Sequence, residues 1–312
     1  MKTMDKTGTI MTVTGPMTPS ELGVTDAHNH LWVSPALGVV PDAPHVTDAV
    51  AVTRQLVAFR HGGGRTIIDC QPAFCGRDAA RLLEFSTACD VAVVASTGFH
   101  RHRYYAPEEI IPWTYSPEQA CGLFIQELTQ GTVETASSSH PVRAGVIKVA
   151  CEDTIAESPI SLLEAAAEAA LRTGVAIEVH TQRGADAQGI FAFFERRGVG
   201  YHTILCHMDK RPDTGLHREL AQAGAVLEYD TFLRPQYSPE KNVWPLIEFM
   251  ADNELTDSVC IGTDMVDDMW TKGTSLTDCF VSVRGRLAQL GLTKQQIAGM
   301  TGANITRRLA SV

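Results

Sequence analysis

The sequence predicts a single-domain α/β protein over residues 1–312, folded as a (β/α)8 barrel, also called a TIM barrel. Two patterns favour this fold. Apolar runs of strand length alternate with stretches of helical spacing, which indicates a parallel sheet, and eight such pairs are present. A chain of 312 residues also has an ordinary size for such a barrel, which needs about 250. No segment rich in Pro, Gly or Ser divides the chain, so we expect one domain.

The predicted strands are runs in which apolar residues alternate with polar ones or continue without interruption. In chain order they cover residues 23–30, 65–70, 91–97, 144–149, 175–181, 203–207, 225–229 and 259–263.

The predicted helices lie between these runs and after the last one. They cover residues 46–60, 78–89, 117–130, 161–172, 186–196, 215–223, 242–253 and 276–290. Capping residues support several of them: Thr47 or Asp48 suits the start of the first, Ser116 the start of the third, and Gly174 and Gly224 suit helix ends. The tail, residues 293–309, has apolar spacing and is expected to add one more helix.

An open nucleotide-binding sheet is the less favoured arrangement. No G-x-G-x-x-G motif follows the first strand. The run Gly62-Gly63-Gly64 comes after the first helix and directly before the second strand, so it indicates a helix stop and a tight turn.

Composition excludes several classes of protein. The net charge of -10 argues against a general nucleic-acid binder. No apolar run approaches the roughly 18 residues that span a bilayer, and polar residues interrupt the first twenty positions, so we expect no membrane segment and a cytoplasmic location. The eight cysteines lack C-x-x-C spacing, which favours buried free thiols over disulfides and gives no support to a cysteine zinc site.

The first candidate for chemistry is Thr25-Asp26-Ala27-His28-Asn29-His30, at the end of the first strand. Side chains alternate faces along a strand, so His28 and His30 point the same way and can hold one metal ion. An isolated pair of this kind is more often two histidines in a turn. What favours the metal is that further ligand-type residues occur at the ends of later strands: Lys148, His180, His207 and Asp264.

These residues predict a metal centre at the barrel mouth, because active sites of such barrels lie at the carboxyl ends of the strands. Four imidazoles and a carboxylate exceed what one tetrahedral ion needs, which indicates two metals. Lys148 lies in an apolar strand, where an unpaired ammonium is costly. A buried lysine with a depressed pKa can react with carbon dioxide to give a carbamate that bridges two cations. A simple ion pair with Glu178 or Asp264 is the alternative.

Six short segments occur in this order along the chain: T-D-A-H-N-H, A-G-V-I-K-V, E-V-H-T, L-C-H-M-D, Y-D-T-F and G-T-D-M. Together they resemble the phosphotriesterase-related branch of the amidohydrolase superfamily, including its lactonases. The similarity extends from about Gly23 to Ile305 and covers nearly the whole chain.

The resemblance implies a (β/α)8 barrel with a binuclear, usually zinc, centre. His28, His30 and Asp264 would bind the more buried divalent metal, and His180 and His207 the more exposed one. Lys148, carboxylated at its N6 atom (Nζ), and a hydroxide would bridge the two ions. A water between two cations has a pKa near neutrality, and Asp264 would carry the proton to the leaving group.

The residues of the loops at the mouth indicate which kind of substrate the site would bind. Cationic side chains follow the third, sixth, seventh and eighth strands: Arg101, Arg103, Arg211, Arg234 and Lys272. A guanidinium fork matches carboxylate, sulfonate or phosphate geometry, which favours a small anionic substrate, although a single loop arginine is more often solvated. The segment from Arg234 to Tyr237 resembles the corresponding loop of sugar lactonases, but Gln236 stands where those proteins often have a lysine.

Other loop residues are further candidates for substrate contact. His100 and His102 form a second H-x-H, which we interpret as substrate contacts or plain loop residues, since the metal centre is complete without them. Arg101, Tyr104 and Tyr237 are the remaining expected contacts.

The sequence therefore predicts a metal-dependent hydrolase that opens a lactone or a related carboxylic ester with an anionic group. Cleavage of a phosphoester, phosphotriester or N-acyl amide on the same site is the alternative, and a non-catalytic binding protein is disfavoured because all six metal positions are filled. Barrels of this group often form homodimers, but the sequence identifies no interface.

Overall fold

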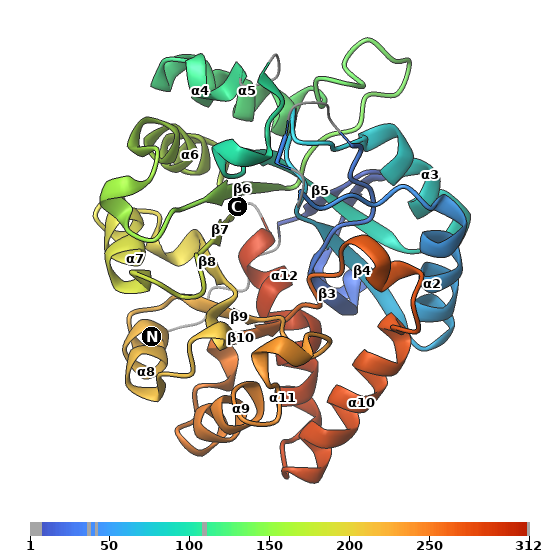
Figure 1. The fold of residues 1–312 in the computed structure, drawn as a ribbon, viewed down its shortest axis with the longest axis vertical. Coiled ribbons are helices and arrows are strands. Elements are labelled where there is room, and N and C mark those ends of the chain that lie inside the picture. The colour runs from blue at the N-terminus through green and yellow to red at the C-terminus, as the bar shows by residue number, and fades with distance from the viewer. Residues whose placement is uncertain (1–7, 36–38, 41–42, 108–110, 311–312) are drawn as a thin grey trace.

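The computed structural model describes residues 8–35, 39–40, 43–107 and 111–310. Eight parallel strands form one sheet in the order β10-β9-β8-β7-β6-β5-β4-β3. The sheet closes on itself where the backbone N–H groups of Thr263 and Asp264 donate to the carbonyl of His28, at 3.1 and 2.8 Å. Figure 1 shows these strands at the centre with helices around them. The predicted (β/α)8 barrel is confirmed.

The barrel strands match the eight predicted runs. They are β3 (Val24–Asn29), β4 (Gly64–Asp69), β5 (Ala92–Gly98), β6 (Val146–Ala150), β7 (Ile177–His180), β8 (Thr203–Cys206), β9 (Val226–Tyr229) and β10 (Val259–Ile261).

The main helices follow these strands in turn. They are α2 (Ala49–His61), α3 (Ala79–Cys89), α5 (Pro117–Thr129), α6 (Ile160–Thr173), α7 (Ala187–Glu195), α8 (Thr214–Gln222), α9 (Val243–Asp252) and α10 (Leu276–Gln289), with the short α4 (Ile111–Thr114) before α5. Local chemistry sets several of their ends. Asp48 caps α2 by accepting from Ala51, Ser116 forms a capping box with Gln119, and Gly174 ends α6 in a left-handed conformation.

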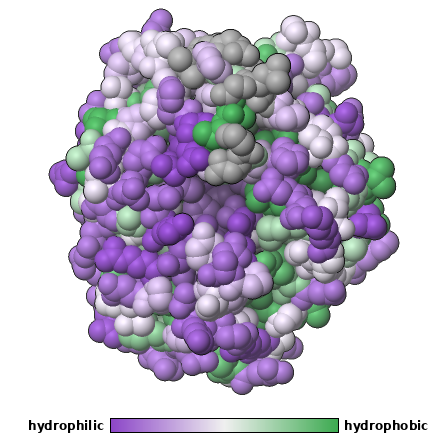
Figure 2. Space-filling model, in the orientation of Figure 1, coloured by the Kyte–Doolittle hydropathy of each residue, from purple (hydrophilic) through white to green (hydrophobic). Residues whose placement is uncertain are grey.

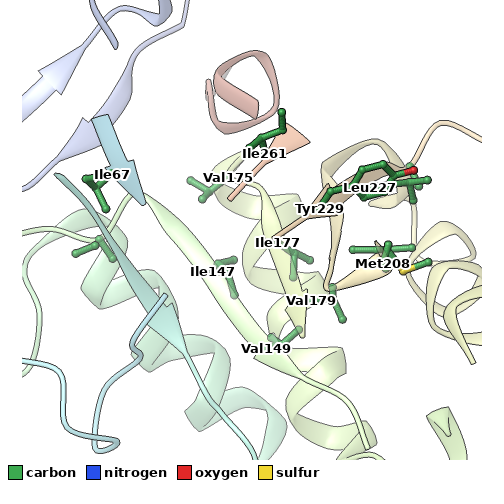
Figure 3. Packing of buried hydrophobic residues seen from close by; sticks show 14 of the residues in the cluster. Ile67, Ile147, Val149, Val175, Ile177, Val179, Met208, Leu227, Tyr229 and Ile261 are labelled. Atoms are coloured by element: carbon green, nitrogen blue, oxygen red, sulfur yellow. The ribbon is translucent and has the colours of Figure 1, made fainter. Parts of the chain in front are cut away.

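Alternation along the strands builds two layers. Outward residues pack against the helices, and Figure 3 shows part of this cluster, in which Ile147 and Val149 of β6 neighbour Ile177 and Val179 of β7. Inward residues form a second apolar cluster that fills the N-terminal end of the barrel, including Val94, Val146, Ala176, Ile204 and Val226. The bottom is therefore packed, and polar groups are left for the mouth.

Two regions differ from the sequence expectations. Residues before the barrel form a hairpin, β1 (Ile10–Thr12) with β2 (Gly15–Met17), followed by α1 (Pro19–Leu22). The tail is not one helix but α11 (Lys294–Ala298) and α12 (Asn304–Leu309), separated by an irregular turn around Gly302. At that turn the backbone passes so close to Gly23 that a Cβ on Gly302 would lie 2.2 Å from its carbonyl oxygen.

All eight cysteines are free and buried, as expected. Among the described residues, no helix is long and apolar enough to cross a membrane.

Candidate metal centre

Inside the barrel, polar side chains begin two residues further along the strands than the apolar layer, toward the carboxyl ends. There the inward positions of β6, β7, β8 and β9 hold Lys148, Glu178, Cys206 and Glu228. Beyond them, at the carboxyl ends of the strands, lie the histidines and Asp264. His207 directly follows Leu205 and Cys206, so simple alternation would turn its ring outward; a left-handed backbone conformation (φ 65°) accompanies the change in direction.

One group of donors is His28, His30 and Asp264. Their ligand atoms lie within 4.8 Å of one another, and all three residues are buried. Asp264 Oδ1 lies 3.9 Å from His28 Nε2 and 3.7 Å from His30 Nε2. His30 Nδ1 is buried and has no hydrogen-bond partner within the described part of the chain. The three residues thus present imidazole and carboxylate atoms to one small volume, as a divalent metal requires.

The second group is the pair His180 and His207. His180 Nδ1 lies 2.9 Å from His207 Nε2. The other nitrogen of His207, Nδ1, lies 2.6 Å from Asp230 Oδ2, which fixes the ring and leaves Nε2 aimed at His180. The ring of His100 lies 5.1 Å from that of His180.

Burial lowers the pKa of every one of these imidazoles, in the case of His30 to about 4. Neutral rings carry the lone pairs that bind metals. The donor set therefore fits divalent metal ions at neutral pH.

Glu228 orients His28 from below. Its Oε1 lies 2.7 Å from His28 Nδ1, and both side chains are buried. A carboxylate in this position fixes the tautomer of a ligand histidine so that Nε2 faces the metal. Among the described residues, Glu228 Oε2 makes no hydrogen bond of ordinary geometry, although Asp230 is close enough to help raise the pKa of Glu228.

Lys148 lies beside the first group. Its Nζ is 3.5 Å from both ring nitrogens of His28 and 3.3 Å from Cys206 Sγ. Within the described parts of the chain, no ion pair within 4.0 Å joins it to Glu178 or Asp264. Burial acts to lower the pKa of Lys148, but the acidic groups of Cys206, Cys70, Glu178 and Glu228 raise it above its usual value. Without bound metal, the pKa of Lys148 is thus shifted in the direction opposite to the one expected from sequence, because the buried carboxyl groups of Glu178 and Glu228 favour the ammonium. Bound divalent cations would oppose this effect.

A cavity of about 460 Å³ opens above these groups, and its lining includes both histidine groups and Asp264. Figure 2 shows a hollow at the centre of this face with hydrophilic side chains in its depth. Arg234 Nη2 lies 2.9 Å and Lys210 Nζ 3.5 Å from Asp264 Oδ2. Burial would raise the pKa of Asp264, but these cations hold it well below its usual range.

Some of the residues expected to contact the substrate line the cavity, and others do not. Arg234, His100 and Tyr104 line the cavity. Tyr237 lies behind Lys210, whose Nζ is 5.1 Å from the tyrosine ring centre. Arg101 is bonded to Glu152 and Gln182 and is absent from the lining.

The sequence interpretation missed Lys210 and Glu228. Lys210 stands three residues after His207, a position that could have drawn attention to it. Glu228 occurs inside an apolar strand 200 positions from its partner His28, so no local pattern indicated the contact.

Known proteins resemble this chain over 72% to 97% of its length. A "Phospho-furanose lactonase" of Mycoplasmopsis synoviae is 25% identical, with 96% of this chain and 91% of that protein covered. An "N-acetyltaurine hydrolase" of Salmo salar is 27% identical, with 72% of each covered. The crystal structure of a lactonase from Listeria monocytogenes superposes with a TM-score of 0.86 at 19% identity, covering 97% of this chain and 99% of the other.

The model of the phosphotriesterase family matches residues 8–309. The family predicted from the motifs is therefore confirmed, and the chain belongs to the phosphotriesterase family.

Proposed function

We propose that this protein is a binuclear metal-dependent hydrolase that opens a lactone or a related carboxylic ester bearing an anionic group. The observation that carries the proposal is the convergence of two donor groups, His28–His30–Asp264 and His180–His207, on the floor of one cavity. The lactonases among the relatives support the choice of reaction.

Each group would hold one ion. The first ion would be bound by His28, His30 and Asp264, and the second by His180 and His207. Zinc suits donors of this kind. When bound, two divalent cations supply Lewis acidity, which lowers the pKa of a water and polarises the carbonyl to be attacked. Lys148, carboxylated at Nζ, would add an anionic ligand; its place beside His28 and the family resemblance support that assignment.

The residues of the chain then have separate tasks. Asp264 remains a carboxylate at neutral pH and is available to accept a proton from the attacking water and deliver it to the leaving oxygen. Arg234 and Lys210 reach the cavity beside Asp264, where they would hold the anionic group of the substrate. His100 and Tyr104 border the same space.

The test is hydrolysis by protein loaded with zinc, with proton release from a panel of lactones, phosphotriesters and N-acyl amino sulfonates. We expect turnover of lactones, fastest for those with a carboxylate or phosphate. Asp264→Asn should abolish it, whereas Asp268→Asn, an exposed change in the same loop, should not. Turnover of phosphotriesters alone would refute the lactone assignment.

Lys148 has a separate test. Lys148→Ala should lose bound metal and activity, with partial recovery when short carboxylates are added. Wild-type metal content in this variant would refute the carbamate ligand.

Amide hydrolysis is the second candidate, because relatives named N-acetyltaurine hydrolase match 72% of the chain. The same panel separates it from ester opening, since only this candidate predicts turnover of the N-acyl sulfonates in preference to the lactones.

A further inference from the structure

The cavity has one apolar side that the proposed chemistry does not use. The connection between β3 and α2 contributes Val33, Pro35, Val39, Val40 and Pro44 to the lining, and Val266 of the next loop round the barrel joins them. We call these six residues the apolar wall. In Figure 2 a small hydrophobic patch borders the central hollow.

The apolar wall is tied to the barrel at several points. Val33 and Val46 exchange backbone hydrogen bonds of 3.1 and 3.0 Å at the base of the connection. The N–H of Ser34 donates to the carbonyl of Gly76 at 2.8 Å, and the N–H of His45 donates to Asp267 Oδ1 at 2.8 Å. The described part of this connection is therefore held at the mouth by bonds to two other loops.

The cationic side lies in a different sector of the mouth. Lys210 follows β8 and Arg234 follows β9, whereas the apolar wall follows β3 and β10. Because β10 lies between β9 and β3 in the closed barrel, the wall adjoins the cationic sector, and a ligand centred over the metal groups can reach the cations with one end and the wall with the other.

A substrate rich in hydroxyls fits this arrangement poorly. Hydroxyl groups against valine and proline side chains would lose water without gaining a hydrogen-bond partner, which is unfavourable. Three polar residues of the lining adjoin the wall in sequence: Ser34, His45 and Asp267. The Ser34 hydroxyl accepts from Trp32 Nε1 at 2.9 Å, and His45 Nδ1 lies 3.6 Å from Asp267 Oδ1, so each already has a partner.

We propose that the substrate of this site is amphiphilic, with an anionic group toward Lys210 and Arg234 and an alkyl or acyl group against the apolar wall. The inference rests on the proposed function for the position of the reacting carbonyl, and it extends that function by naming the second half of the substrate. It predicts a preference for alkyl-substituted acids over polyhydroxylated ones.

The test measures binding and needs no turnover. Zinc-loaded protein is titrated calorimetrically with methane-, propane-, pentane- and heptanesulfonate, which are not hydrolysed. Each methylene that reaches the wall should lower Kd roughly fourfold, until the wall is covered. The corresponding 1-alkanols should bind much more weakly, because they lack the anionic group.

Val40→Thr combined with Val266→Thr keeps the shape of the wall and adds hydroxyls. This variant should flatten the dependence of Kd on chain length, while Val50→Thr, on the 79% exposed Val50 of α2, should leave it unchanged. Melting temperatures check that both variants fold.

The inference would be overturned if Kd depended on chain length equally in the wall variant and the wild type. It would also be overturned if the wild type bound long sulfonates no more tightly than short ones. If the protein hydrolyses anionic lactones but the Kd of the sulfonates does not depend on chain length, only the inference about the apolar wall is rejected. If Kd falls with chain length but no substrate is hydrolysed, the proposed reaction is rejected and the inference about the wall is retained.

Discussion

Glu228 offers a sharp test of how the chain prepares its metal ligands. In the proposed assignment the carboxylate contacts His28 and not the metal ions, although it also belongs to two other groups of buried residues that could hold a metal. It lies 2.7 Å from His28 Nδ1 in a fully buried contact. Removing such an outer partner typically weakens metal binding 10- to 100-fold, or about 1.4 to 2.7 kcal/mol. We expect Glu228→Ala to raise the dissociation constant of the ion held by His28 by this amount, and Glu228→Gln to have a smaller effect because an amide oxygen still accepts from Nδ1.

The assay is competition for zinc against a chromogenic chelator, which resolves the two ions by affinity. Glu178→Gln is the matched comparison, because Glu178 on β7, two strands away in the barrel, is as buried as Glu228. It accepts from the Cys70 thiol at 2.7 Å and, among the described residues, makes no bond to an imidazole. The orienting role is refuted if Glu228→Ala binds both ions as tightly as the wild type. It is also refuted if Glu178→Gln raises the dissociation constant of the ion held by His28 as much as Glu228→Ala does.

Three further predictions follow from other parts of the structure. Arg234→Ala should raise KM for anionic lactones about tenfold or more while leaving neutral lactones nearly unaffected; equal loss for both would contradict its role. Gly302→Ala should destabilise the fold by about 1–3 kcal/mol in urea unfolding, because the new Cβ meets a backbone carbonyl, whereas Gly285→Ala, with open space at mid-helix, should be neutral or stabilising. Burial lowers the pKa of His217 to about 4, so its stabilising effect is complete above pH 6.5 and is lost as the pH falls toward 4. The stability difference between the wild type and His217→Gln should therefore shrink by up to about 3 kcal/mol from pH 7.5 to pH 4; a constant difference would refute the assignment.

The barrel and its ligand positions were predictable because they follow from alternation. Inward residues of parallel strands meet at one mouth, so His28, His180 and Asp264 could be brought together before any coordinates were known. The apolar runs and caps also located the strands and helices that carry them. What could be predicted is therefore the part of the fold set by short-range periodicity.

The remainder depends on contacts between distant residues. The break at Gly302 results from the close passage of Gly23, which no helical period reveals. The pKa of Lys148 depends on groups from several other strands. The sequence offered Glu178 or Asp264 as its ion-pair partner, whereas the structure places Cys206 Sγ 3.3 Å from its Nζ. Lys210 becomes a candidate only when Asp264 is seen 3.5 Å away.

The most direct test of the whole account is anomalous diffraction at the zinc absorption edge from crystals of the metal-loaded protein. We predict two peaks, one among His28, His30 and Asp264 and the other between His180 and His207, with added density at Lys148 Nζ. A different group of buried side chains, His28, Glu178, Cys206 and Glu228, also has ligand atoms within 4.8 Å of one another. A single ion in that group, or no ion at the mouth, would contradict the account.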